Sequence, residues 1–179
     1  YNCIEKIMKM VKRFVIDSKK QIILLLDAYF ANATAFDYVY DANKETEKEQ
    51  IILIARAKSN AVGYKLPEKS DKKRVGRPKK YGDSIKFKDM FKNNFEGATK
   101  AVVKLYDKKE EIEYLCFDVL WKPVKRLCRF VLVKTKEKTM ILICSNMNIE
   151  PIDIILGYSY RFKIEVTFKT LKHTIRGFF

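Results

Sequence analysis

Four residues near the C-terminus are of types that act on nucleic-acid phosphates, and their spacing predicts one shared helix face. Tyr158, Arg161, Glu165 and Lys172 follow one another at intervals of three, four and seven residues in one long amphipathic stretch. At about 100° per residue, these positions fall within an arc of roughly 60°. A carboxylate on such a face holds a metal ion, cations hold phosphate oxygens, and a ring stacks on a base. The alternative is a solvated face with one ion pair between Arg161 and Glu165.

This spacing matches a known motif. The pattern Tyr158-x2-Arg161-x3-Glu165-x6-Lys172 resembles the Y-(2)-R-(3)-E-(6)-K signature of DDE transposases of the insertion sequence four type. All four residue types and all three intervals agree with that signature. The match motivates a comparison of the rest of the chain with the same family.

Three apolar runs upstream are similar to core strands of that family, in the same order. The run Ile22–Leu26 is followed at once by Asp27, as in the segment that carries the family's second catalytic aspartate. Ile51–Lys58 resembles the next core strand, and Ile141–Asn146 resembles the strand before the signature helix. Because Ile22–Leu26 is apolar at every position, we expect a strand covered on both faces of a sheet.

The resemblance implies a fold, a reaction and roles for individual residues. It implies an RNase H-like α/β fold with a β-rich insertion between Asp27 and Glu165. The implied reaction is DNA strand cleavage and strand transfer by two-metal phosphoryl transfer, with Mg²⁺ or Mn²⁺ held by Asp27 and Glu165 as catalytic ligands. Arg161 and Lys172 would contact phosphates, and Tyr158 would stack on or position a base. The implied partner is double-stranded DNA, both transposon ends and target, with a homodimer in the synaptic complex.

One feature of the family is missing. The family carries a first catalytic aspartate on a strand before the second one, and no such segment precedes Asp27; Asp17 is too close and lies in a stretch with helical periodicity. We therefore expect the C-terminal part of a longer transposase with its first core strands missing. A non-catalytic, DNA-binding remnant of a transposase is the alternative.

The chain divides into three segments by pattern. Residues 1–58 are expected to form a partial RNase H-like core, residues 59–138 a β-strand insertion with a basic loop, and residues 139–179 the last core strand and the signature helix. The insertion contains three β-rich runs, Ala101–Tyr106, Ile112–Trp121 and Arg126–Lys134. Its only tryptophan, Trp121, is interpreted as a core residue rather than a shelf for a displaced base.

A basic segment inside the insertion is the second predicted contact with DNA. It has no helical or strand periodicity, and a Gly-Arg-Pro sequence resembles a minor-groove hook. Groove insertion and simple phosphate contact both remain open for its cations. They are Lys73, Arg74, Arg77, Lys79 and Lys80.

Composition favours a polyanionic partner. The chain has 37 Lys and Arg against 22 Asp and Glu, a formal net charge of +15. Such an excess binds nucleic acid by releasing its counterions, although an RNA-binding protein of the ribosomal type shares this composition.

Four cysteines without a paired spacing exclude a zinc site and favour reduced, mostly buried thiols in a cytoplasmic protein. No apolar run reaches membrane-spanning length.

Helical signals frame the predicted strands. Apolar residues recur at helical spacing from Ile4 to Val15, and Asn32 is placed to cap a following helix with Phe36 on its buried side. Pro151 marks the first turn of the signature helix, which is expected to continue through Lys172.

Overall fold

The computed structural model describes residues 3–18, 20–45, 50–67, 78–93, 95–105 and 108–175. Its fold is mixed α/β, as the sequence predicts. The elements in chain order are α1 (Cys3–Ser18), β1 (Ile22–Leu26), α2 (Ala33–Glu45), β2 (Ile51–Arg56), β3 (Val62–Tyr64), β4 (Ser84–Lys86), α3 (Phe87–Lys92), β5 (Thr99–Leu105), β6 (Lys108–Trp121), β7 (Arg126–Lys134), β8 (Thr139–Cys144), α4 (Pro151–Ser159) and α5 (Arg161–Ile175).

Eight strands form one sheet in the order β1-β2-β8-β7-β6-β3-β4, with β5 paired to β6. Among the described strands, β1 and β2 run parallel, and the other neighbouring pairs are antiparallel. The strands of residues 59–138 continue the sheet that contains β1 and β2 rather than forming a second sheet. The division into three segments is therefore not visible as a break in the sheet, and it stays a prediction.

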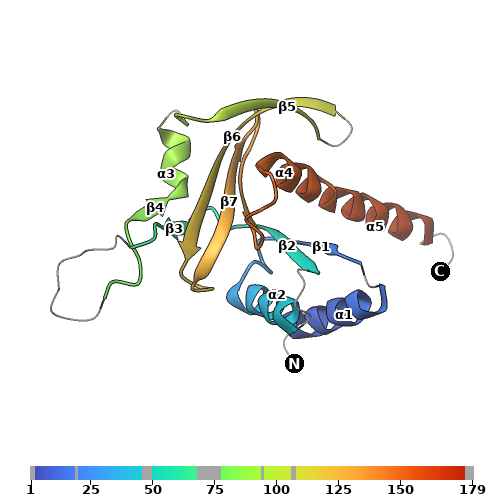
Figure 1. The fold of residues 1–179 in the computed structure, drawn as a ribbon. Coiled ribbons are helices and arrows are strands. Elements are labelled where there is room, and N and C mark those ends of the chain that lie inside the picture. Colours follow the sequence, from blue (N-terminus) through green and yellow to red (C-terminus); the bar gives the residue numbers. More distant parts are fainter. Residues whose placement is uncertain are drawn as a thin grey trace.

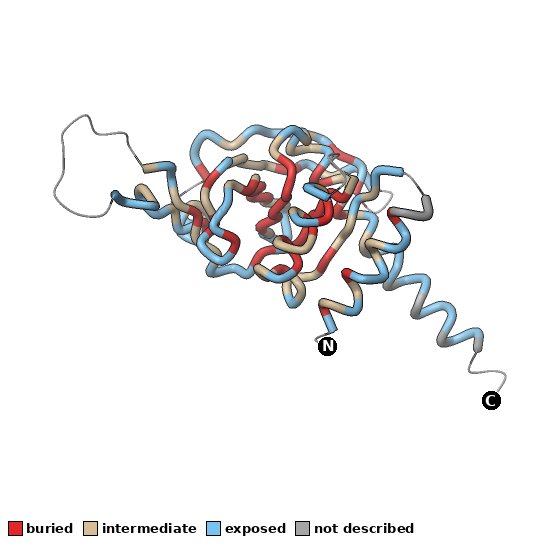
Figure 2. The backbone as a smooth tube through the Cα atoms, turned by 60° about the horizontal axis from the view of Figure 1, so that its bottom comes forward, coloured by how far each residue is buried: buried red, intermediate tan, exposed pale blue. Residues whose placement is uncertain are grey.

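Helices cover both faces of this sheet, because its central strands are apolar on both sides. Helices α1 and α2 lie along one face and α4 along the other (Figure 1). Along β7, Phe130 and Leu132 pack toward the α1–α2 side, whereas Val131 and Val133 pack toward α4. The buried segments gather in the middle of the molecule (Figure 2). Side chains at alternate positions of a strand point to opposite faces, so one continuous apolar run supplies both cores.

Strand β1 is present, but the expectation that both of its faces are covered is wrong. Only Leu26 is buried, and Ile23 is 53% exposed. The physical reason is position: β1 is the edge strand of the sheet, paired with β2 on one side and with no described strand on the other. Its neighbour β2 is buried from Ile51 to Ala55, because α2 packs on one of its faces and α4 on the other.

The predicted helix signals hold at the starts of two helices. The Asn32 side chain accepts a hydrogen bond from the Ala35 backbone N–H at 3.1 Å, which caps α2. Ala35, Phe36 and Val39 are fully buried on its inner side. Helix α4 begins at Pro151, in the first turn, where a missing N–H costs nothing.

The single long helix expected from Pro151 to Lys172 is instead two helices that meet at Tyr160. The Tyr160 N–H bonds the Gly157 carbonyl at 3.2 Å, and the Lys163 N–H bonds the Tyr160 carbonyl at 3.1 Å. Such tight i to i−3 hydrogen bonds interrupt the regular α-helical ladder. Tyr158 therefore belongs to α4, while Arg161 opens α5.

Trp121 is a core residue, as predicted. It is 8% exposed and contacts Phe36 edge-on at a centroid distance of 5.4 Å.

None of the described helices is long and apolar enough to cross a membrane.

Candidate active site

Asp27 lies at the carboxyl end of β1, where the chain turns sharply. Its backbone carbonyl accepts hydrogen bonds from the N–H groups of Phe30 (3.0 Å) and Ala31 (3.1 Å). Its side-chain Oδ1 accepts the N–H of Ala28 at 2.7 Å. The turn thus orients the carboxylate, whose side chain remains 44% exposed. Polar groups at the carboxyl ends of parallel strands are well placed to meet ligands.

Arg161 meets this carboxylate from the other end of the sequence. A terminal nitrogen of its guanidinium, Nη2, is 3.0 Å from Asp27 Oδ2, and its side chain is 26% exposed. Arg161 is the first residue of α5, and α4 packs against β1 and β2, which carries the start of α5 to the end of β1. The structure therefore brings together two of the predicted site residues.

The other members of the signature are placed differently. Tyr158 is 8% exposed and belongs to the core between α4 and the sheet. Its ring faces apolar side chains, so stacking on a base requires that this part of α4 move. Glu165 and Lys172 lie in α5, four and eleven positions after Arg161, but their side chains are outside the described part of the structure. Their predicted roles stay predictions.

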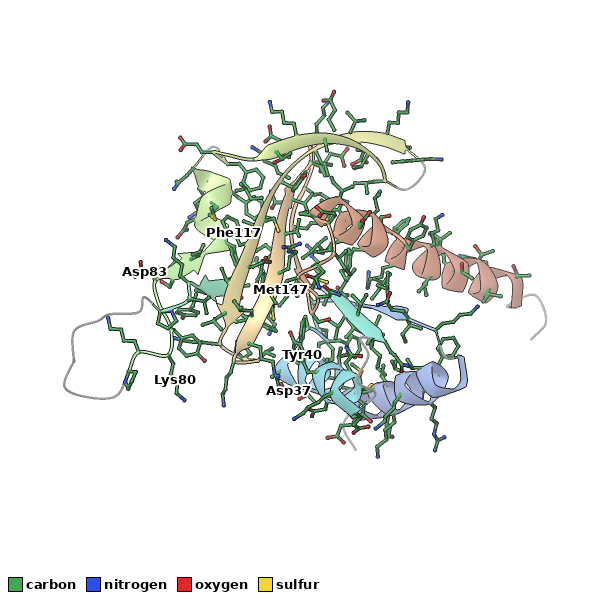
Figure 3. All side chains as sticks on the ribbon, in the orientation of Figure 1. Asp37, Tyr40, Lys80, Asp83, Phe117 and Met147 are labelled. Carbon is green, nitrogen blue, oxygen red and sulfur yellow. The ribbon has the colours of Figure 1, made fainter. Side chains whose placement is uncertain are left out.

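The basic segment lies largely outside the described residues. This is the case for Lys73, Arg74 and Arg77, whereas Lys79 and Lys80 are described and exposed. The segment leaves and rejoins the body at a defined root, because the Gly82 N–H bonds the Lys65 carbonyl and the Lys65 N–H bonds the Asp83 carbonyl, each at 2.9 Å. Lys80 lies on the side of the molecule away from α5 (Figure 3).

Cations that the sequence analysis did not single out surround a pocket beside Asp27. Arg56 is the last residue of β2, and Lys58 follows two residues later. With Lys88 and Lys92 of α3, they line a pocket of about 430 Å³ that also includes Ala28. The available signal was that Arg56 ends its buried strand as Asp27 ends its own, and that Lys88 and Lys92 stand four residues apart.

The residues present fit one ligand of a divalent ion. Mg²⁺ is usually held by one or two carboxylates together with substrate phosphates, and Asp27 offers an accessible carboxylate. Among the described side chains, no group of three or more His, Cys, Asp and Glu is arranged to hold a metal. Because Arg161 contacts Oδ2, a metal at that oxygen would require the ion pair to open.

Comparison with known proteins adds no assignment. No family model, no curated protein and no solved structure matches this chain.

Proposed function

We propose that this chain is part of the catalytic domain of a DDE transposase, and that it binds double-stranded DNA. The observation that carries the proposal is the ion pair between Asp27 and Arg161. The signature and the apolar strand ending in Asp27 were matched separately in the sequence, and nothing in their spacing required them to meet. Their contact is what a shared site demands.

The sheet supports an RNase H-like core that is only partly present. Strand β1 has no charged residue, proline or bulge to protect its outer edge. Soluble proteins rarely leave such an edge unpaired, since its free N–H and C=O groups template the addition of another strand. An additional strand along β1 would also place its own side chains beside Asp27, where the first catalytic aspartate belongs.

The chemistry proposed for the complete site is phosphoryl transfer. Two Mg²⁺ ions, when bound, activate the attacking oxygen and stabilise the leaving oxygen. Asp27 and Glu165 would hold them, and Arg161 would exchange its contact with Asp27 for a phosphate oxygen. An arginine suits this exchange, because its planar donors bind carboxylate and phosphate in the same manner.

A non-catalytic DNA-binding role is the second candidate, and one observation favours it. The Arg161 guanidinium already neutralises Asp27, so within the described residues the carboxylate has a satisfied partner without any metal. A remnant that kept its basic surfaces would bind DNA and have no use for the ion.

Metal-dependent DNA binding distinguishes the two candidates. If the proposal holds, Asp27 and Glu165 would hold a divalent ion that adds positive charge to the site, so adding Mn²⁺ should tighten binding to a duplex and raise the Tm of the free protein. Asp27→Asn and Glu165→Gln should each reduce both effects. Glu137→Gln, an exposed carboxylate of the β7–β8 turn, serves as the matched control.

The outcomes separate cleanly. If Mn²⁺ changes the wild type and both site variants equally, Asp27 and Glu165 do not hold a metal and the remnant is the better description. If the wild type does not bind duplex DNA at all, both candidates fail. Competition with structured RNA then tests the ribosomal type of partner.

A further inference from the structure

The pocket beside Asp27 has a rim of cations and no acidic lining residue. Arg56, Lys58 and Lys88 are exposed, and no described acidic side chain forms an ion pair with any of them. Lys92, the fourth cation, is 3.7 Å from Asp89 in an exposed pair, which is weak in water. Three cations without an acidic partner among the described residues and one weakly paired lysine favour an anion of more than one negative charge.

The inner wall of the same pocket is apolar. Ala57, Met140 and Ile141 contribute from strand ends, and Phe91 contributes from α3. The Phe91 ring is fixed by stacking on Phe95, with centroids 5.1 Å apart and planes at 15°. A pocket that joins a cationic rim to a rigid apolar wall suits a ligand with a charged end and a flat, weakly polar body. A nucleotide has this construction.

We propose that this pocket binds a phosphomonoester nucleotide, with the terminal phosphate on the rim and the attached nucleoside against the Phe91 wall. A terminal phosphate carries about −1.5 to −2 charge at pH 7, whereas each internal phosphodiester carries only about −1. A volume of about 430 Å³ admits the end of a strand but not the body of a duplex. The ligand is therefore a 5′-phosphorylated DNA end or a free nucleotide.

The two sources are separated by two measurements on the whole chain. In the first, anisotropy compares duplexes that differ only in a 5′-phosphate or a 5′-hydroxyl on an unpaired overhang. The wild type should bind the phosphorylated end about fivefold more tightly. In the second, calorimetry compares deoxyadenosine 5′-monophosphate with deoxyadenosine. Binding of the monophosphate alone identifies the free nucleotide as a ligand also.

Charge-matched variants localise the effect. Lys58→Gln with Lys88→Gln removes two cations from the rim, and it should abolish the preference for the phosphorylated end. Lys108→Gln with Lys109→Gln removes the same charge at the start of β6, where both lysines are exposed, and it should lower overall affinity while keeping the preference. Ser59 also lines the pocket, so Ser59→Glu, which adds a negative charge, should abolish the preference. Ser59→Gln introduces an uncharged side chain of the same shape as glutamate, and it should retain most of the preference.

The anisotropy measurement on duplexes rests on the proposed DNA binding, but failure of the pocket assignment can be distinguished from failure of the proposed function. Tight duplex binding with equal affinity for phosphate and hydroxyl ends, together with no monophosphate binding, overturns the pocket assignment and leaves the proposed function standing. Loss of the preference in the Lys108 and Lys109 variant also overturns it. If the duplex is not bound, monophosphate binding that disappears in the Lys58 and Lys88 variant still supports the pocket, and its absence refutes it.

Discussion

At the scale of single residues, the Asp27–Arg161 ion pair is of modest strength, but it joins the start of α5 to the carboxyl end of β1. Both side chains retain solvent access, so water screens their attraction, and such pairs contribute about 0–1 kcal/mol. By contrast, Arg129 is 16% exposed, donates to both carboxylate oxygens of Asp118 at 2.8 and 2.7 Å, and donates to the Ile149 carbonyl at 2.8 Å. Arg129 thus fixes the entry to α4, whereas the ion pair of Arg161 with Asp27 is partly open to solvent.

Arg161→Gln should therefore change metal binding more than stability. Its free energy of unfolding should fall by less than about 1 kcal/mol, while the Tm gain on adding Mn²⁺ should increase because the competing cation at Asp27 is gone. Thermal unfolding with and without Mn²⁺ measures both quantities. Lys169→Gln, an exposed cation farther along α5, is the control. An unchanged Mn²⁺ effect in Arg161→Gln would show that Asp27 binds no metal.

The cysteines should differ in reactivity because they differ in burial. Cys3 is exposed, Cys116 is partly buried, and Cys128 and Cys144 are buried, all as free thiols. The expectation of mostly buried thiols holds for the latter two. Burial raises the pKa of the Cys128 thiol to about 12. Labelling with a thiol reagent at pH 8 should modify Cys3 first and leave Cys128 intact until the protein unfolds.

The same shift of pKa predicts how stability depends on pH. The unfolded chain loses the Cys128 proton near pH 9, while the native protein keeps it until about 12. The contribution of the buried Cys128 thiol to the free energy of unfolding is therefore complete below pH 9 and is lost as the pH rises toward 12. Burial also raises the pKa of Tyr40, whose hydroxyl lies 3.9 Å from the Cys128 sulfur. Urea unfolding of Cys128→Ala should show a shallower decline over this range than the wild type.

At the scale of elements, two glycines show how the insertion is anchored to the sheet. A Cβ at Gly63 of β3 would lie 2.5 Å from a methyl of Val119 and 2.8 Å from the Phe87 ring. A Cβ at Gly82 would lie 2.7 Å from the Leu66 carbonyl oxygen. The neighbours of Gly63 are the buried side chains of Val119 and Phe87, whereas the neighbour of Gly82 is the Leu66 backbone, which belongs to the root of the basic segment and cannot easily move.

Gly82→Ala should consequently destabilise the protein by about 1–3 kcal/mol, as other overpacked substitutions do. Gly157→Ala is the matched control, because its new Cβ would meet only the Ile54 side chain at an ordinary 3.5 Å and alanine favours the helical conformation. Urea denaturation of the two variants measures the difference. Equal stability of Gly82→Ala and wild type would mean that the root adjusts without cost.

At the scale of the whole molecule, the predicted DNA contacts are widely separated. The basic segment joins the body at one side of the sheet, near Lys80, and α5 extends from the other (Figures 1 and 3). Asp27 and the cationic pocket lie with the ends of β1 and β2. One duplex that reached both α5 and the basic segment would run across the sheet, so its binding energy would be spread over many weak phosphate contacts.

Binding should accordingly depend strongly on salt. Replacing all five cations of the basic segment by glutamine should weaken duplex binding and reduce the slope of log affinity against log salt by about 0.9 for each phosphate that is no longer neutralised. Fluorescence anisotropy over a range of salt concentrations measures this slope. Five exposed lysines elsewhere give a variant of the same charge: Lys100, Lys108, Lys109, Lys136 and Lys138. If the affinity falls equally in both variants, the basic segment has no special place in the interface.

Most elements were predictable because their signals are local. The helical period of Ile4–Val15, the cap at Asn32 and the apolar run Ile51–Lys58 each reflect forces within a few residues of the chain, and α1, α2 and β2 agree with them. The mixed α/β class follows from the alternation of these patterns. The identity and spacing of the signature residues were also readable directly.

Only the tertiary structure decided what those residues contact. Helical spacing placed Tyr158 and Arg161 on one face, but the interruption at Tyr160 and the packing of α4 bury the first and leave the second against Asp27. Strand order put β1 at an edge and opened the cationic pocket at its carboxyl end. Periodicity along the chain records which positions are apolar, whereas the pairing of distant strands determines which polar groups meet, and that pairing depends on contacts no local window contains.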